Sequence, residues 1–389
     1  MRIGVNCFIL GPSIGGLKQY FHSLFNYLLD HDLENQYIFF YFFDYNLSEL
    51  EQFKSARWRE GAIHLTDQME VLHHLEKIDL YFCPFGCLWP MPIPKPSVVT
   101  LVDIQEKYYP EFFTPRDLRT REYHFDGSTH MADRVITISQ FSKDSIARFH
   151  RISPTKIDVV YLSADERIIH AKETEIDLGF PLSKRFIFYP ANRWKHKNHD
   201  CLLRALCLLR DKYGMKIEAI LTGYEQSNGY PLTDKIDEYG LADQVYNVGY
   251  VSVEQMAYLY RHAFLLCFPS YFEGFGMPLV EAMSLGCPIV CANTSSIPEV
   301  VGGAALLFNP DDPLECALQI RRLWMDEDDR KRLMWKGLEL SKTFSSEKLA
   351  RGHLDVFRRA EKDFAWSRYV WRKFIFHPMH KARCYMNHL

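Results

Sequence analysis

Two glutamates, Glu273 and Glu281, flank a glycine-containing bend in the segment SYFEGFGMPLVEAMSLGCP. Pro278 suits the first turn of a helix, where its missing N–H costs no hydrogen bond, and Gly286 suits the point at which a helix stops. The pattern predicts a helix of about two turns that contains Glu281, with Glu273 in the loop before it. Such a helix would leave the Glu281 carboxylate near the C-terminal edge of a parallel sheet, where α/β proteins bind ligands.

The bend between the two glutamates could bind an anion. Gly274, Phe275 and Gly276 would let the backbone approach a ligand closely, and a helix N-terminus offers unpaired N–H groups that favour phosphate. A carboxylate one turn further along would repel phosphate, but it could accept two hydrogen bonds from vicinal hydroxyls such as those of ribose. The segment therefore predicts a site for a nucleotide diphosphate.

Length and composition indicate a two-domain protein that acts on small molecules. The chain has 389 residues, of which 47% are hydrophobic, and a net charge of -3, so neither a disordered chain nor a nucleic-acid partner is expected. The N-terminal segment MRIGVNCFIL lacks the pattern of a signal peptide, and the apolar runs are shorter than the ~20 residues of a membrane span. The ten cysteines lack the spacing of zinc or redox pairs. We therefore expect a cytoplasmic protein with reduced thiols.

Short apolar runs alternate with amphipathic helical patterns along the chain, which predicts an α/β fold with parallel sheets covered by helices. The polar segment from Ser163 to Lys184 is typical of an interdomain linker. We predict an N-terminal Rossmann-like domain, a linker, a C-terminal Rossmann-like domain, a crossing helix and a basic aromatic tail, at residues 1–165, 166–184, 185–345, 346–363 and 364–389.

The motifs and their order resemble a known family. Glu273 and Glu281 stand in the pattern E-G-F-G-x-P-x-x-E-A, and further segments include GGLKQYFHSL, VTLVDIQEKYYPEFF, ADRVITISQFSKDSI, YPANRWKHKNHDCLL and SSIPEVVGGAALLFNPDDP. Together they resemble the retaining glycosyltransferases of family four. The resemblance implies the GT-B fold, which has two facing Rossmann-like domains, an active site between them and a C-terminal helix that crosses back to the first domain.

The resemblance also implies a role for each residue of the bend and its flanks. Glu281 would bind the ribose, and Glu273 would face the transferred sugar. Gly274, Phe275 and Gly276 would contact the sugar and the phosphates through their backbone.

Further residues are implied for the diphosphate and the base. Lys197 in HKNH would bind the diphosphate together with Arg193, and two cations there would offset the charge that develops on the departing group without a metal ion. Gly16, in the loop after the first strand, would close the diphosphate site from the first domain. The remaining nucleotide-binding positions are Gly223, Tyr250 and Val251. Gly16 could instead be an ordinary turn glycine, and Tyr250 and Val251 could simply end a strand.

One position departs from the family pattern. Many relatives have His-Asp where this chain has Val102 and Asp103, so the expected histidine is missing. Asp103 could contact the acceptor or could only cap the next segment. His124 and His130 could approach the cleft, but a lone histidine more often has a packing role, and we assign no catalytic histidine.

Two other signals could suggest a metal, and we expect none. The acidic run that includes Asp326 and Asp328 heads a helix, where capping explains it. His196 and His199 have no third ligand nearby in the sequence.

The tail carries its own pattern. Trp366, Tyr369, Val370 and Phe374 fall at helical spacing beside basic residues, as in an interfacial helix attracted to anionic lipid. The alternative is a helix that packs on the first domain. The prediction for residues 366–389 is thus peripheral contact with the inner face of a membrane, or packing alone.

These patterns together predict a metal-independent retaining glycosyltransferase. It would move a hexose from a nucleotide-diphosphate sugar to a hydroxyl of a glycan or a lipid-linked saccharide, and it would need no separate cofactor. The HKNH and VTLVDIQ segments resemble mannosyltransferases, so GDP-mannose is the expected donor. Two alternatives remain: a GT-B nucleotide-sugar epimerase, and a weakly catalytic nucleotide-binding scaffold subunit.

Overall fold

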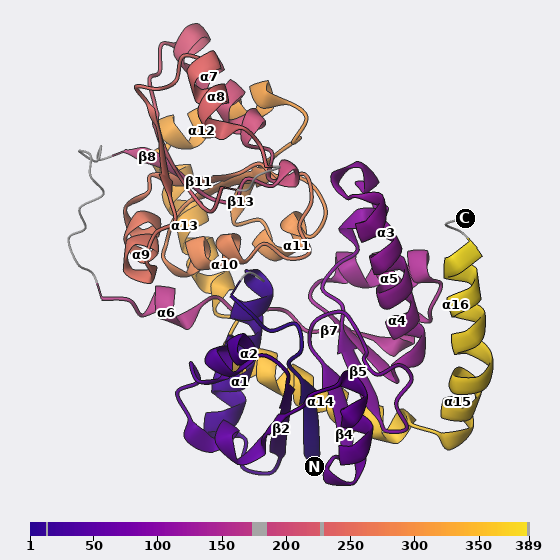
Figure 1. Ribbon diagram of the computed structural model, residues 1–389. Coiled ribbons are helices and arrows are strands. Elements are labelled where there is room, and N and C mark those ends of the chain that lie inside the picture. Colours follow the sequence, from indigo (N-terminus) through magenta and orange to yellow (C-terminus); the bar gives the residue numbers. More distant parts are fainter. Residues whose placement is uncertain (13–14, 173–184, 226–228, 387–389) are drawn as a thin grey trace. The chain divides into compact units, whose positions relative to one another are not determined.

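The computed structural model describes residues 1–12, 15–172, 185–225 and 229–386, and it divides the chain into two compact units (Figure 1). The first unit contains Met1–Leu162 and Ser346–Leu389, and the second contains Ser163–Ser345. The chain therefore leaves the first unit once and returns to it before its C-terminus.

The first unit is built on a parallel sheet, which has seven strands in the described part of the chain, in the order β3-β2-β1-β4-β5-β6-β7. Strands β4 and β5 are buried at every residue, as expected of a parallel sheet covered on both faces. The strands are β1 (Arg2–Asn6), β2 (Gln36–Tyr41), β3 (Ala62–His64), β4 (Leu80–Cys83), β5 (Ser97–Thr100), β6 (Arg134–Thr137) and β7 (Ile157–Val159). The helices before the second unit are α1 (Gly16–His31), α2 (Asp44–Leu50), α3 (Pro115–Arg121), α4 (Gly127–Met131) and α5 (Gln140–His150).

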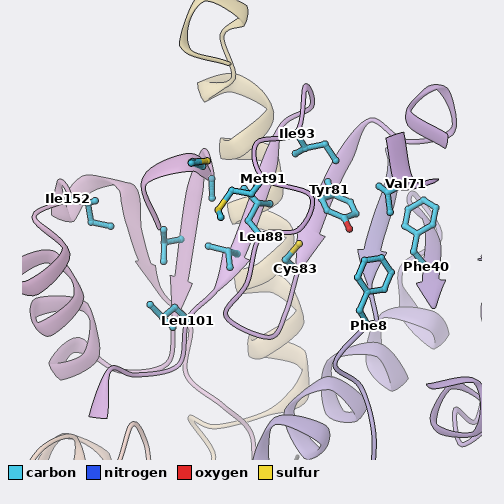
Figure 2. Close-up of a cluster of buried hydrophobic side chains, with 14 of the residues drawn as sticks. Phe8, Phe40, Val71, Tyr81, Cys83, Leu88, Met91, Ile93, Leu101 and Ile152 are labelled. Carbon is cyan, nitrogen blue, oxygen red and sulfur yellow. The ribbon is translucent and has the colours of Figure 1, made fainter. Parts of the chain in front are cut away.

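Apolar side chains fill both faces of this sheet. Figure 2 shows part of the cluster on one face, from Phe40 and Tyr81 through Met91 to Ile152. On the other face, Phe82 lies 5.0 Å from Phe357, measured between ring centroids. Each large side chain buried in this way contributes about 1.5–3 kcal/mol to folding.

Phe357 belongs to α14 (Ser346–Asp363), which packs on α1 and on strands β4, β5 and β6. His353 of the same helix is fully buried, and its Nε2 lies 2.7 Å from the Tyr20 hydroxyl of α1. This is the crossing helix that the sequence predicted.

The second unit is also a parallel sheet, with six strands among its described residues, in the order β10-β9-β8-β11-β12-β13. The order reverses between β8 and β11, and doubly wound sheets bind ligands at the carboxyl ends of the strands beside such a reversal. The strands are β8 (Phe186–Pro190), β9 (Glu218–Thr222), β10 (Val245–Gly249), β11 (Leu265–Phe268), β12 (Ile289–Ala292) and β13 (Ala305–Phe308). The helices are α6 (Glu166–Ile169), α7 (His199–Tyr213), α8 (Leu232–Glu238), α9 (Val253–His262), α10 (Met277–Ser284), α11 (Ile297–Val301), α12 (Pro313–Met325) and α13 (Glu327–Ser341).

Short 3-10 or π-helical turns complete both units. They are η1 (Ala56–Gly61), η2 (Gln68–Lys77), η3 (Gln105–Lys107), η4 (Pro110–Phe112), η5 (Glu122–Asp126), η6 (Pro154–Lys156), η7 (Lys195–Lys197) and η8 (Arg372–Phe376).

The predicted linker, residues 166–184, differs from the structure at its start. Residues 166–169 form α6, which packs on α9 and α10 of the second unit, and Arg261 Nη2 donates a hydrogen bond of 2.9 Å to the Ile169 carbonyl. Residues 173–184 lie outside the described residues. The unit boundary at Leu162 also assigns 163–165 to the second unit, whereas the sequence placed them in the first domain.

The tail is part of the first unit. It forms α15 (Trp366–Trp371), the turn η8 and α16 (His377–Met386), which run along one side of that unit (Figure 1). Within the described ranges, no helix combines the length and the apolar character that a bilayer span requires.

Candidate functional site

The segment with the two glutamates folds as predicted. Helix α10 begins at Met277, contains Glu281, and follows a loop that contains Glu273. Gly276 stands immediately before the helix with φ 98°, and a Cβ at this position would lie 2.8 Å from Leu279 Cδ1. Only glycine fits this sharp entry into the helix without strain.

Serines that follow β12 hold the loop in place. The Ser296 hydroxyl donates to the carbonyls of Glu273, at 2.9 Å, and of Phe275, at 3.2 Å. The Glu273 N–H in turn donates to Ser295 Oγ at 2.9 Å. The loop after β11 is thus fixed by hydrogen bonds to a second loop.

Glu273 forms an ion pair with Lys197. Lys197 Nζ lies 2.7 Å from Glu273 Oε1, and the two side chains are only 18% and 11% exposed. The Tyr189 hydroxyl donates to the Lys197 carbonyl at 2.5 Å, which fixes the backbone of turn η7. Two residues far apart in the sequence therefore meet at the carboxyl ends of β8 and β11, where the strand order reverses.

Glu281 is 5% exposed, and its carboxylate accepts a hydrogen bond of 2.8 Å from the Tyr260 hydroxyl of α9. Tyr260 is fully buried, and this burial raises the pKa of Tyr260 well above its ordinary value, so the phenol keeps its proton and acts as a donor. Tyr260 was not predicted from the sequence, because it is one aromatic residue among several on an amphipathic helix.

Arg193 is buried rather than presented beside Lys197. It is 1% exposed, and Nη1 donates to the Ala191 carbonyl at 3.0 Å and to His199 Nε2 at 3.2 Å. Nη2 donates to Asn247 Oδ1. Burial lowers the pKa of Arg193, and burial also lowers the pKa of His199 to about 3, which leaves that imidazole neutral and able to accept.

The contacts of Arg193 tie the end of β8 to α7 and β10. None of its recorded side-chain contacts in the described ranges is with Lys197 or with a carboxylate. A direct contact of Arg193 with a diphosphate stays a prediction.

Two exposed tyrosines stand at the ends of neighbouring strands. Tyr224 follows β9 and Tyr250 follows β10, they are 56% and 67% exposed, and their rings stack with centroids 4.8 Å apart. Gly223, with φ 129°, allows this arrangement, because a Cβ there would lie 2.4 Å from the Ala191 carbonyl oxygen. Val251 is only 5% exposed and lies inside the unit.

Tyr250 was among the predicted residues and Tyr224 was not. The signal for Tyr224 was present, since a Gly-Tyr pair stands at the end of the strand in both ILTGY and NVGY.

The remaining candidate residues lie in the first unit. Gly16 is the first residue of α1 rather than a loop residue, and Gly15 before it adopts φ 51°. Asp103 Oδ1 accepts a hydrogen bond of 3.1 Å from the N–H of Gln105, the first residue of turn η3. His130 Nδ1 lies 2.9 Å from the Asp126 carbonyl of the preceding turn. The roles predicted for Gly16 and Asp103 in ligand binding stay predictions.

The acidic run before α13 caps that helix, because Asp326 Oδ1 accepts from the Asp329 N–H at 2.9 Å. Burial holds the pKa of His196 well below its ordinary value. In the part of the chain that the structure describes, no three His, Cys, Asp or Glu side chains gather in a way that could hold a metal ion.

Residues 171–337 match the family model described as glycosyl transferases group 1. The chain is 29% identical over 269 residues to O-antigen chain mannosyltransferase B of Escherichia coli, and the match covers 67% of this chain and 70% of that protein. It is 29% identical over 223 residues to the O-antigen chain mannosyltransferase RfbU of Salmonella typhimurium, and here it covers 57% of this chain and 59% of the relative.

Solved structures share the fold. The Anabaena HepE structure in complex with UDP and glucose has a TM-score of 0.72 at 19% identity and covers 92% of this chain and 100% of that chain. A glycosyltransferase from Rickettsia africae has a TM-score of 0.71 at 15% identity, with coverage of 93% and 99%. The predicted GT-B fold is thereby confirmed. Residues 171–337 are thus similar to the glycosyl transferases of group 1, and the predicted similarity to mannosyltransferases is confirmed.

Proposed function

We propose that this protein is a retaining, metal-independent glycosyltransferase that moves mannose from GDP-mannose to a hydroxyl of a glycan or a lipid-linked saccharide. The observation that carries the proposal is the Lys197–Glu273 ion pair at the strand-order reversal of the second unit. The mannosyltransferases among the relatives support the choice of sugar. A lipid-linked acceptor would place the enzyme at the cytoplasmic face of a membrane.

The two residues of the ion pair would bind different parts of the donor, Lys197 the diphosphate and Glu273 the sugar. When the donor binds, the diphosphate would attract the Lys197 ammonium, and Glu273 would become available to accept hydrogen bonds from sugar hydroxyls. The ammonium would also stabilise the charge that grows on the departing diphosphate, which is the largest electrostatic demand of the reaction.

The nucleoside would lie along the same edge of the sheet. Glu281, held by Tyr260, would accept hydrogen bonds from the two ribose hydroxyls. Tyr224 and Tyr250 would offer an aromatic surface on which the base can stack, since stacking on aromatic side chains tolerates different bases.

The chemical step needs no protein nucleophile. The acceptor oxygen would form a bond to the anomeric carbon on the face from which the diphosphate leaves, as the bond from that carbon to the phosphate oxygen breaks. The acceptor proton would pass to an oxygen of the departing diphosphate. Burial of Lys197 and Glu273 limits the access of water, which would otherwise compete with the acceptor.

The test is release of nucleoside diphosphate by the purified protein in EDTA, with GDP-, UDP- and dTDP-sugars as donors. We expect release from GDP-mannose that is lost in Lys197→Ala and Glu281→Ala and is kept in Lys195→Ala, since Lys195 is an exposed lysine of the same turn. Activity that depends on an added divalent metal would contradict the metal-independent mechanism. Turnover of the donor sugar without transfer to any acceptor would favour the epimerase alternative. Nucleotide binding with no turnover of any donor or acceptor would favour the scaffold alternative.

A further inference from the structure

The tail helix, α15 to α16, is fixed to the first unit by one of its faces. Arg372 is 5% exposed, and its Nη1 donates to Asp133 Oδ1 at 2.8 Å. Eight residues further along the chain, His380 is 3% exposed, and its Nε2 lies 2.9 Å from the Tyr123 carbonyl of turn η5. The Phe376 ring stacks on His130 between these two anchors, with centroids 4.9 Å apart. This inner face therefore accounts for how the helix packs.

The apolar side chains that lie outside this inner face are exposed, and we call their surface the outer face. Phe374, Met379 and Tyr385 are 67%, 66% and 71% exposed, although each lies in a helix that is otherwise well anchored. The other large apolar side chains that are exposed on the tail are Trp366, Val370, Trp371 and Ile375. Exposed apolar residues occur singly on any protein surface, but seven of them between Trp366 and Tyr385 mark an interaction surface.

Cations without a carboxylate partner are mixed with these apolar groups. Residues 364–389 contain five lysines and arginines and no aspartate or glutamate. Two of the five are neutralised, Arg372 by Asp133 and Arg383 by Asp126. The other three cations, for which no ion pair is found in the described ranges, are Arg368, Lys373 and Lys381.

The cations lie close to the aromatic groups. Lys373 Nζ is 5.4 Å from the centroid of the Phe374 ring and 5.8 Å from that of Tyr369. A surface that combines exposed tryptophan, tyrosine and aliphatic groups with unpaired cations complements an interface that is apolar on one side and anionic on the other.

We propose that the outer face of residues 366–385 docks on the surface of an anionic phospholipid bilayer. Its apolar side chains enter the boundary between headgroups and acyl chains, and Arg368, Lys373 and Lys381 contact lipid phosphates. The inference rests on the tail alone and not on the donor site. It extends the proposed function because a lipid-linked acceptor lies at such a surface.

A second copy of the chain is a poorer occupant. In a two-fold contact the same surface meets itself, so the three unpaired cations would face a second tail that contains cations and no acidic residue to neutralise them. Anionic lipid removes this repulsion, because each cation gains a phosphate.

The test is sedimentation of the full-length protein with vesicles of phosphatidylcholine alone and of phosphatidylcholine mixed with phosphatidylglycerol. One variant, Phe374→Ser with Met379→Ser, removes two outer apolar groups. The other, Lys373→Glu with Lys381→Glu, reverses two outer charges. The matched control is Trp335→Ser with Lys336→Glu, an exposed tryptophan and lysine on α13 of the second unit.

We expect the wild type and the control to bind the anionic vesicles and both tail variants to bind them at least about tenfold more weakly. Raised salt should weaken the wild type and should have less effect on the charge-reversed variant. Circular dichroism and GDP binding should be unchanged in both variants, which separates a failure of this inference from a failure of the donor site.

The inference is overturned if the wild type does not bind anionic vesicles, or if the tail variants bind as tightly as the wild type. It is also overturned if sedimentation velocity shows a dimer that the variant with Phe374→Ser and Met379→Ser dissociates, because the outer face would then be a contact between two copies.

Discussion

Opposite effects on nucleotide binding are expected from the two partners of the Lys197–Glu273 ion pair. Glu273→Gln should tighten the binding of GDP, whereas Lys197→Met should weaken it. In the protein without donor, Lys197 is engaged by Glu273 at 2.7 Å, so a diphosphate must compete with that carboxylate for the ammonium. Glutamine keeps the shape of glutamate but neither competes as an anion nor repels the phosphates.

The magnitude follows from the burial of the pair. A hydrogen bond to a charged group contributes about 1.5–3 kcal/mol, and the side chains are 18% and 11% exposed, so we take the lower value to allow for residual screening. A change of about 1.4 kcal/mol corresponds to a factor of ten in Kd. We therefore expect Glu273→Gln to bind GDP about tenfold more tightly and Lys197→Met to bind it about tenfold more weakly. Sugar transfer should fall in both variants.

Isothermal titration calorimetry with GDP, and with UDP as a second probe, measures these changes, and thermal unfolding checks that each variant is folded. Lys197→Met should also lose stability, since it leaves a largely buried carboxylate without its cation. If the pair is only structural, both substitutions will affect binding in the same direction or not at all. Weaker GDP binding by Glu273→Gln would refute the competition between carboxylate and diphosphate.

Three further outcomes are expected. Tyr260→Phe should lower the free energy of unfolding by about 1.5–3 kcal/mol and weaken GDP binding, because the Glu281 carboxylate loses its buried donor. Urea unfolding measures the stability and calorimetry measures the GDP affinity. An unchanged GDP affinity would contradict the role of Glu281. Gly276→Ala should cost about 1–3 kcal/mol in the same urea assay, because φ is 98° and the new Cβ would meet Leu279. Burial lowers the pKa of His353 from 6.5 to about 4, so the unfolded chain binds a proton that the native protein does not, and stability should fall as the pH drops from about 6.5 toward about 4. His353→Gln should flatten this slope by up to about 1.4 kcal/mol per pH unit in urea unfolding at a series of pH values, and an unchanged slope would contradict it.

Local signals made the centre of the candidate site predictable. The loop with Glu273, the glycine before the helix and the helix with Glu281 follow from residues within one short segment, because Gly276 and Pro278 determine the backbone there. The alternation of apolar runs predicted two parallel sheets for a similar reason, since each strand and helix has a pattern that can be recognised within a few residues.

Partners that meet only in three dimensions could not be predicted. The sequence named Arg193 as a companion of Lys197, but its guanidinium is satisfied by Ala191, His199 and Asn247, and no local pattern reports such contacts. The same holds for Tyr260, which binds Glu281 from another helix. Residues 166–169 were assigned to a linker because the segment that contains them is largely polar, although contacts with α9 make them part of the second unit.

The charged groups of the site are paired within the protein before any donor is present. Lys197 holds Glu273, and Tyr260 holds Glu281, so neither carboxylate is left buried without a partner. A buried charge without a partner would cost several kcal/mol and would favour a collapsed or protonated site. When a donor with a diphosphate binds, its groups would replace these internal partners. The free energy of binding is then the difference between the two sets of contacts, and not the full value of the new set. Binding of the nucleotide can therefore remain reversible although its contacts with Lys197 and Glu281 would be charge-assisted, as the proposed transfer requires for release of the nucleoside diphosphate.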